Sequence, residues 1–137
     1  MVNAATLDEL LAAALGRIRR YQPADVPGDA VIVDIRSANE RARDGVVPGA
    51  LHIPRTVLEW RVAHDSKWRT PQLDGTERLV LLCDHGYSSI LAAAILVDLQ
   101  LDAGDVIGGF EAWKRAGLPV ASAREPEPGP PGMGLPD

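Results

Sequence analysis

Cys83 is the only cysteine of the chain, and its neighbours are residue types that make a thiol reactive. It follows an apolar run at residues 79–82 and precedes a short loop containing Gly86, after which a long apolar helix is expected to begin near Ser88. In a strand–loop–helix arrangement the loop amides and the positive end of the helix dipole converge on the sulfur and favour the thiolate. A lone cysteine is more often a small buried apolar residue. The place of Cys83 at a strand-to-helix junction nevertheless favours a nucleophile.

The residues after Cys83 are candidates for surrounding a ligand at the sulfur: Asp84, His85, Gly86, Tyr87, Ser88 and Ser89. Gly86 allows a tight winding that brings backbone amides close to a ligand. Ser88 and Ser89 are able to cap the helix or to donate through their hydroxyls, and for Ser89 the two roles are equally favoured. His85 is either a donor to a bound anion or a histidine at the rim without a chemical role. Cys83 and the histidines lack the spacing of metal ligands, so no metal site is expected.

Further polar residues are predicted to support this loop. Asp34, Arg36 and Glu40 resemble an acid–base set, but an i,i+4 ion pair between Arg36 and Glu40 that orients the loop is the favoured interpretation. Asp34 and Arg36 are therefore supporting residues. Other side chains are assigned by type and place: Arg55, Arg61 and Arg69 as candidate anion-binding residues beside the pocket, Trp60 and Trp68 as pocket walls, His52 as a packed and hydrogen-bonded residue, and Trp113 as core.

Apolar periodicity predicts the elements that position these residues. Helices are expected at residues 6–19, 38–43, 55–64, 88–101 and 109–116, and strands at 30–35, 50–53, 79–83 and 105–107. The segment at residues 47–50 has the Pro-Gly centre of a type II turn. Strands that alternate with helices predict an α/β fold with a mostly parallel sheet and helices on both faces. Ligands of such sheets bind at the carboxyl ends of the strands, where Cys83 is expected to lie.

Length and composition exclude several classes of function. The 137 residues suffice for one domain, and a net charge of −5 without a basic patch argues against nucleic-acid or anionic-membrane partners. No secretion signal or membrane-spanning run is visible, and a single cysteine forms no internal disulfide, so a reducing, cytoplasmic location is expected. Residues 1–120 are assigned to the domain and residues 121–137 to a disordered tail rich in proline and glycine.

Three segments together resemble the rhodanese family of single-domain sulfurtransferases. Residues 31–36 and 45–50 are similar to its N-terminal signature, residues 107–119 to its C-terminal signature, and Cys83 to Ser89 to the Cys-x-His-Gly-x-Ser-Ser form of bacterial thiosulfate sulfurtransferases. The resemblance implies a five-stranded parallel sheet, a persulfide on Cys83, and no cofactor. It implies a small sulfur-containing donor such as thiosulfate, and cyanide, a thiol or a protein sulfur acceptor. Two residues depart from the family pattern, Val46 in place of histidine and Asp84 in place of a basic residue, and Asp84 disfavours anions if its carboxylate faces the pocket.

Two other functions fit the same scaffold. A phosphatase or arsenate reductase requires one more loop residue and an arginine six positions after the cysteine to hold the oxyanion, whereas Ser89 stands there. A non-catalytic or regulatory binding module is the other alternative, since rhodanese folds without the cysteine serve that role and a fold alone does not determine function.

Overall fold

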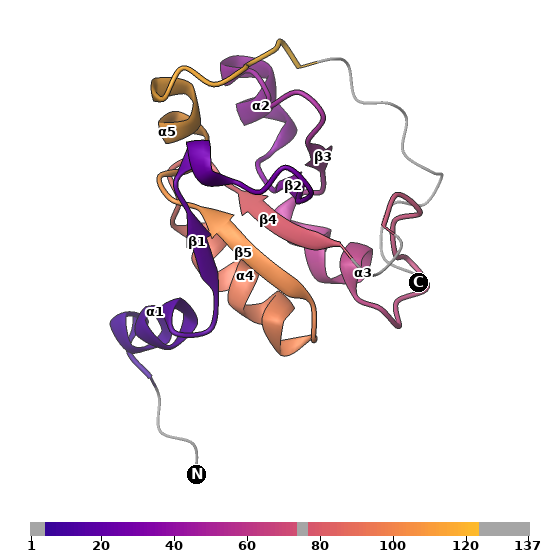
Figure 1. The fold of residues 1–137 in the computed structure, drawn as a ribbon. Helices are drawn as coiled ribbons and strands as arrows, with labels where there is room; N and C mark the ends of the chain where they lie inside the picture. Colours follow the sequence, from indigo (N-terminus) through magenta and orange to yellow (C-terminus); the bar gives the residue numbers. More distant parts are fainter. Residues whose placement is uncertain (1–4, 74–76, 124–137) are drawn as a thin grey trace.

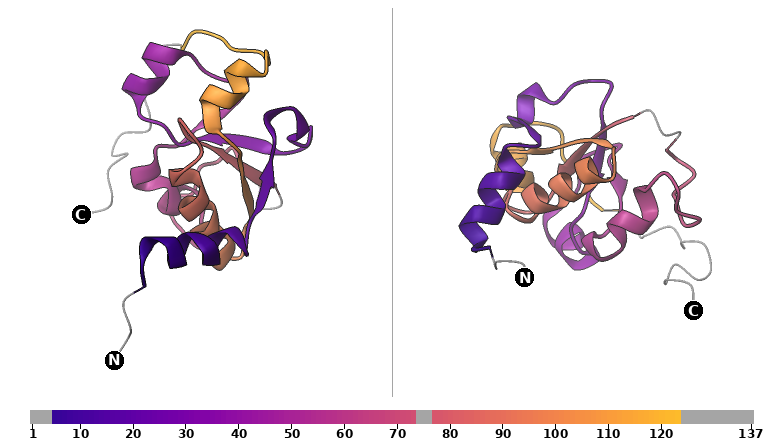
Figure 2. Two further views of the ribbon diagram at one scale, coloured as in Figure 1. Left: turned by 90° about the vertical axis from the view of Figure 1, so that its left-hand side faces the viewer. Right: turned by 90° about the horizontal axis from the view of Figure 1, so that it is seen from below.

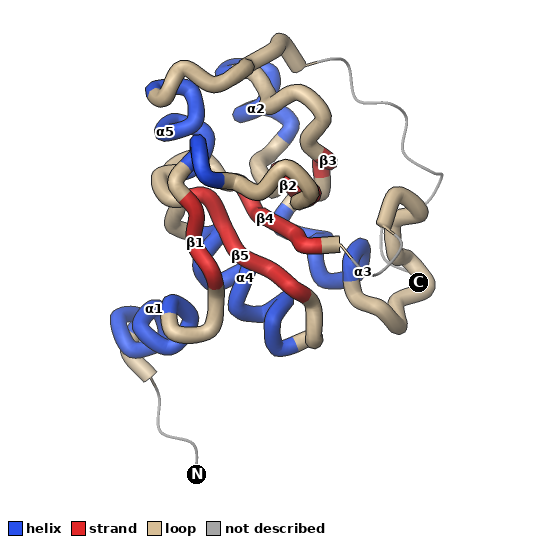
Figure 3. The backbone as a smooth tube through the Cα atoms, in the orientation of Figure 1, coloured by secondary structure: helices blue, strands red, loops and turns tan. Residues whose placement is uncertain are grey.

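A parallel β-sheet forms the centre of the molecule. The computed structural model describes residues 5–73 and 77–123, and within them a five-stranded sheet has the order β1-β5-β4-β2-β3 with every neighbouring pair parallel (Figure 1, Figure 3). The strands are β1 (Arg19–Tyr21), β2 (Val31–Asp34), β3 (Leu51–His52), β4 (Arg78–Leu82) and β5 (Asp102–Val106). The predicted α/β class and parallel sheet are thus confirmed.

Helices cover both faces of this sheet. They are α1 (Leu7–Leu15), α2 (Ala38–Asp44), α3 (Leu58–Val62), α4 (Ser88–Asp98) and α5 (Gly109–Arg115), with short 3₁₀ turns η1 (Pro23–Asp25) and η2 (Arg55–Val57). Apolar residues of α1, α3 and α4 share one buried cluster, and those of α5 belong to a second cluster on the opposite face (Figure 2). In Figure 1, α2 lies beside α5 at the top of the view.

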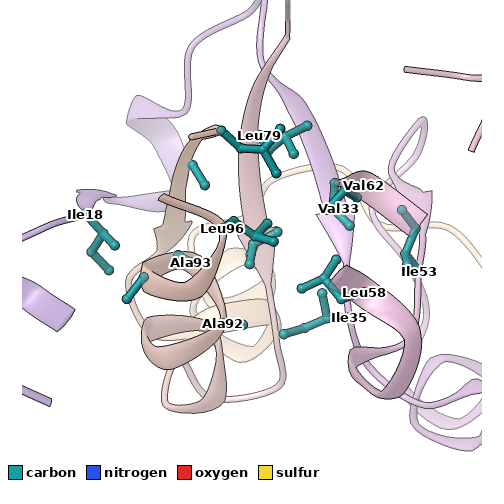
Figure 4. Close-up of a cluster of buried hydrophobic side chains, with 14 of the residues drawn as sticks. Ile18, Val33, Ile35, Ile53, Leu58, Val62, Leu79, Ala92, Ala93 and Leu96 are labelled. Atoms are coloured by element: carbon teal, nitrogen blue, oxygen red, sulfur yellow. The ribbon is translucent and has the colours of Figure 1, made fainter. Parts of the chain in front are cut away.

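The strand sequences explain why both faces are covered. In β4 the side chains of Leu79 and Leu81 join the cluster under α4, whereas Val80 and Leu82 join the cluster under α5, and all four are at most 1% exposed. Figure 4 shows Leu79 near Leu96 of α4 in the first cluster. A strand buried on both faces requires such an unbroken apolar run. Each fully buried leucine or valine stabilises the fold by roughly 1.5–3 kcal/mol.

Several element boundaries differ from the predictions. The helix predicted at residues 6–19 ends at Leu15, and Arg19–Tyr21 instead forms β1, which pairs with β5. The helix predicted at 55–64 is divided into η2 and α3, and β5 begins at Asp102, earlier than predicted. The predicted turn at residues 47–50 is confirmed, because Gly49 has φ +80° and the Ala50 amide donates to the Val47 carbonyl at 3.1 Å.

A short antiparallel bridge joins the segment after α2 to the segment after α5. Val46, after α2, and Ala121, after α5, exchange backbone hydrogen bonds of 2.8 and 2.9 Å. The remainder of the predicted tail, residues 124–137, lies outside the described residues. None of the described helices has the length and hydropathy that a membrane crossing requires.

Candidate active site

Cys83 lies directly after β4, at the carboxyl edge of the sheet, where the sequence predicts it. Its side chain is buried, and Sγ is held by the loop and by the start of α4. The Gly86 amide donates a hydrogen bond to Sγ at 3.1 Å, and Sγ lies 3.3 Å from Oγ of Ser89. The sulfur therefore faces an amide and the first turn of a helix, two features that favour negative charge.

The loop is wound tightly against the turn that precedes α5. Gly86 has φ +85°, and a Cβ there would lie 2.6 Å from the amide nitrogen of Gly108. Gly109 has φ +64°, and a Cβ there would lie 2.4 Å from the Cys83 carbonyl oxygen. Both distances are shorter than real Cβ contacts, so both positions require glycine.

Three carbonyl groups of the loop are anchored on the side away from the sulfur. The donors are the Phe110 amide to the Cys83 carbonyl at 2.8 Å, the Glu111 amide to the Asp84 carbonyl at 3.2 Å, and Arg20 Nη2 to the Gly86 carbonyl at 3.1 Å. In a trans peptide the carbonyl and the following N–H point in opposite directions. The anchors thus turn the amides of Asp84, His85 and Tyr87 away from α5 and Arg20. These amides donate to no residue that the structure describes, which leaves them available to an anion.

Behind the sulfur, Ser89 takes part in a polar network with Asp105 and Arg20, two residues that were not predicted as part of the site. The Ser89 hydroxyl donates to Oδ2 of Asp105 at 2.7 Å, and both residues are fully buried. Arg20 of β1 donates from Nε to Oδ1 of Asp105 at 2.8 Å and from Nη2 to Oδ2 at 3.1 Å. The only signal in the sequence is Asp105 itself, a carboxylate beside apolar strand residues, which requires a partner when it is buried.

The predicted helix-capping role of the serines is not observed. Tyr87 occupies the N-cap position of α4, and no side chain caps this helix end. Ser89 instead bonds to Asp105, while Ser88 is exposed at the edge of the pocket. Of the two roles that the sequence left open for Ser89, capping is not observed, and the hydroxyl donates to Asp105 rather than into the pocket.

A pocket of about 470 Å³ opens above Cys83. Loop residues 84, 85, 87 and 88 line this pocket together with Arg36 and Arg55. Arg55 is also paired with Glu59 at 2.8 Å. The structure does not bring Arg61 to this pocket, because its guanidinium donates to the Trp68 carbonyl at 2.8 Å. Arg69, Trp60 and Trp68 likewise do not line it.

Asp84 and His85 lie between this pocket and a second one of about 490 Å³ beside α5. Oδ2 of Asp84 is 3.4 Å from Nε2 of His85 and 4.0 Å from Nη2 of Arg43. The other ring nitrogen of His85, Nδ1, is 2.6 Å from Oε2 of Glu111. Arg43 binds Asp44 more closely, at 2.7 Å, and this hydrogen bond lowers the pKa of Asp44. The Asp84 carboxylate therefore has basic neighbours on the side of the second pocket.

Asp34 and Arg36 support the pocket as a buried ion pair, with 2.8 Å between Oδ2 and Nη2. The predicted Arg36–Glu40 ion pair is wrong. Glu40 closes a capping box with Ser37 at the start of α2, and the Arg36 guanidinium lies 4.0 Å above the Phe110 ring. Asp34 is fully buried at the end of β2 and needs a nearby cation to compensate its charge, whereas Glu40 does not.

His52 completes this support. Its Nε2 lies 2.8 Å from the Arg36 carbonyl oxygen, and burial lowers the pKa of the imidazole. The predicted packed and hydrogen-bonded role of His52 is confirmed. Among residues 5–73 and 77–123, no three histidine, cysteine, aspartate or glutamate side chains gather as they would around a metal ion.

Fold and loop together define a small α/β protein with a cysteine in an amide-lined loop at the carboxyl edge of the sheet. The chain belongs to the rhodanese-like domain family, whose model matches residues 21–116. It is 36% identical over 96 residues to a thiosulfate sulfurtransferase GlpE of Actinobacillus succinogenes, covering 69% of this chain and 78% of the relative. It is 34% identical over 97 residues to a sulfurtransferase of Allochromatium vinosum, covering 69% and 80%. These relatives support sulfurtransferase activity in general.

Solved structures show the same fold. A protein from Rhodopseudomonas palustris, described as of unknown function and a possible tyrosine phosphatase, superposes with a TM-score of 0.79 at 31% identity over 88% of this chain and 97% of its own. A rhodanese-related protein from Thermoplasma volcanium superposes with a TM-score of 0.64 at 27% identity, covering 77% and 99%.

Proposed function

We propose that this protein transfers a sulfane sulfur from thiosulfate or a related donor to a thiol or to cyanide through a persulfide on Cys83. The observation that carries this proposal is the environment of the sulfur. Sγ accepts a hydrogen bond from Gly86, lies beneath an accessible pocket, and is followed by three loop amides without partners among the described residues. Such a cradle suits an anionic sulfur atom bound to Sγ.

The reaction proceeds in two displacement steps. The Cys83 thiolate attacks the outer sulfur of thiosulfate, an S–S bond forms, and the bond between the two thiosulfate sulfurs breaks, so that sulfite leaves with the electron pair. The acceptor then attacks the terminal sulfur of the Cys83 persulfide, and Sγ departs as the thiolate. No oxidant or reductant is consumed over the cycle.

The loop amides act on the charge that these steps create. The terminal persulfide sulfur carries a negative charge, and the amides of Asp84, His85 and Tyr87 are already turned towards the side on which it would lie. Preorganised donors of this kind contribute roughly 10²–10³-fold each in acyl-transfer enzymes. Arg55, in the wall of the pocket, is the candidate for attracting the anionic donor, although Glu59 shares its charge.

A phosphatase function is the weaker candidate, although one structural relative is described as a possible tyrosine phosphatase. Ser89 occupies the position at which a phosphatase loop carries its arginine, and its side chain points to Asp105 rather than into the pocket. Without that arginine, aryl phosphates should not be hydrolysed above background. Phosphate release that depends on Cys83 would establish the phosphatase function instead.

Mass spectrometry of the protein after incubation with thiosulfate tests the proposal directly. We expect one added sulfur atom on wild-type protein, its removal by cyanide with formation of thiocyanate, and neither event in Cys83→Ser. The substituted protein should melt at the temperature of the wild type, because serine is close in size to cysteine. Thiocyanate formation that persists in Cys83→Ser refutes the covalent mechanism, and an unmodified, inactive wild type favours the regulatory module.

A further inference from the structure

The hydrogen bonds behind Cys83 leave only one position for the Ser89 proton. Ser89 has a single hydroxyl proton, and its Oγ lies 2.7 Å from Oδ2 of Asp105, a carboxylate that only accepts. The proton therefore points towards Asp105. The 3.3 Å contact between Sγ and Oγ is then made by the Cys83 thiol proton, which Ser89 accepts.

A thiolate cannot keep this arrangement. Without its proton, Sγ would face an oxygen lone pair of Ser89, and it gains a hydrogen bond only if the Ser89 hydroxyl turns from Asp105 to the sulfur. The Ser89 hydroxyl can turn away from Asp105 because Arg20 donates to both oxygens of the carboxylate, at 2.8 and 3.1 Å. The carboxylate thus stays compensated in either orientation of the hydroxyl.

We propose that Ser89, Asp105 and Arg20 form a hydrogen-bond switch that sets how readily the Cys83 thiolate forms. The hydroxyl donates to Asp105 while Cys83 is a thiol and to Sγ while it is a thiolate. On ionisation the thiol proton leaves through the pocket to water, the Ser89–Asp105 hydrogen bond is exchanged for one to Sγ, and no covalent bond other than S–H is broken. These three are positioning residues, since none of them lies in the wall of the pocket.

The switch rests on the proposed sulfur transfer and follows its cycle. In the persulfide the negative charge moves to the terminal sulfur, where the free loop amides can bind it. Sγ then needs no donor, and the Ser89 hydroxyl returns to Asp105. Each state therefore has a complete set of hydrogen bonds behind the sulfur, which avoids the cost of a buried group left without a partner.

The rate of Cys83 alkylation by iodoacetamide as a function of pH tests the switch without any sulfur donor. Ser89→Ala should move the midpoint of this profile up by about one pH unit, because the thiolate loses a donor. Asp105→Asn should move it down by about one pH unit, because a neutral amide competes less for the Ser89 proton and a negative charge is removed. Arg20→Gln should move the midpoint up, because an Asp105 carboxylate without its Arg20 partner accepts the Ser89 hydrogen bond more strongly.

These opposite signs separate the switch from a loosened fold, which would move all the midpoints in one direction. Arg19→Gln is the matched control, because it removes the same charge from the exposed neighbour of Arg20 in β1 and should leave the midpoint unchanged. In a Ser89→Ala background the effect of Asp105→Asn should shrink, since the hydroxyl through which Asp105 acts is gone.

An unchanged or raised midpoint in Asp105→Asn overturns the switch, and so does an equal shift in both backgrounds. If Asp105→Asn does not fold, a wild-type midpoint in Arg20→Gln overturns it. The expected shifts in a protein that transfers no sulfur would refute the proposed function alone. Conversely, if the wild type transfers sulfur but Ser89→Ala, Asp105→Asn and Arg20→Gln all leave the alkylation midpoint unchanged, only the switch is refuted.

Discussion

Replacing Gly86 with alanine should disable the Cys83 loop without unfolding the protein. Gly86 has φ +85°, a conformation that costs an L-residue roughly 1–2 kcal/mol. The added Cβ would also lie 2.6 Å from the Gly108 amide nitrogen, so the loop must move away from the turn that anchors it. That movement pulls the Gly86 amide from Sγ, now 3.1 Å away, and tilts the neighbouring amides. Loss of one preorganised donor predicts a fall in kcat of roughly 10²–10³-fold.

Gly49→Ala is the matched control for this experiment. Gly49 has φ +80° but no atom within 4 Å of an added Cβ, and it lies in the turn before β3, outside the walls of the active-site pocket. Both variants should lose roughly 1–2 kcal/mol of unfolding free energy in urea from the backbone conformation. Only Gly86→Ala should lose thiocyanate formation. Activity of Gly86→Ala within about threefold of wild type, or an equal loss of activity in Gly49→Ala, would contradict a role of the Gly86 amide in catalysis.

Three further predictions concern charges around the loop. Asp84→Asn should raise kcat/KM for thiosulfate by about threefold or less at low ionic strength, because Arg43 already offsets part of the Asp84 charge. The gain should shrink in added salt, and a larger gain that does not depend on salt would contradict this explanation. Arg36→Ala should lower the free energy of unfolding by about 3 kcal/mol, the low end for a broken buried ion pair, because buried Asp34 loses Arg36 and keeps only Arg41 at 3.2 Å. Urea titration of Arg43→Ala should show almost no loss, because that ion pair is exposed. Burial lowers the pKa of His52 below its unfolded value of 6.5, so the unfolded chain binds more protons than the folded one. The free energy of unfolding should therefore fall as the pH decreases through 6.5, and it should fall less in His52→Gln.

The parts of the site that the sequence predicts are those with local signals. Cys83 is preceded by an apolar run and followed by glycine and a helix, and this pattern alone places it at the carboxyl end of a buried strand. The alternation of strands and helices predicts the parallel sheet for the same reason, since each element carries its own periodicity. The capping box at Ser37 also involves only neighbouring residues. The partner of Arg36 is Asp34, only two residues away, and the burial of Asp34 at the end of β2 decides this choice over Glu40.

β1 shows why the remainder of the site was not predicted. Arg19, Arg20 and Tyr21 follow an amphipathic helix and look like its last turn, and three residues are too few to show a period of two. The strand exists because it pairs with β5, and that pairing sets Arg20 opposite Asp105. A contact between residues so distant in the sequence depends on the topology of the sheet, which local propensity does not contain. Tertiary pairing therefore determined both the fifth strand and the network behind Cys83.

The position six residues after Cys83 connects this network to the chemistry of the pocket. A phosphoryl group presents several charged oxygens and requires a cation within the loop, which an arginine at this position supplies. Ser89 is fully buried beneath the sulfur and gives its proton to Asp105, so it adds no charge to the pocket. What remains above Sγ is a set of backbone amides that suits one anionic atom, such as the terminal sulfur of a persulfide. Serine in place of arginine at this position thus leaves the pocket without a side chain that binds phosphate. It also places a hydroxyl that can donate to Sγ when the sulfur is negatively charged, and for both reasons we expect the loop to favour sulfur transfer.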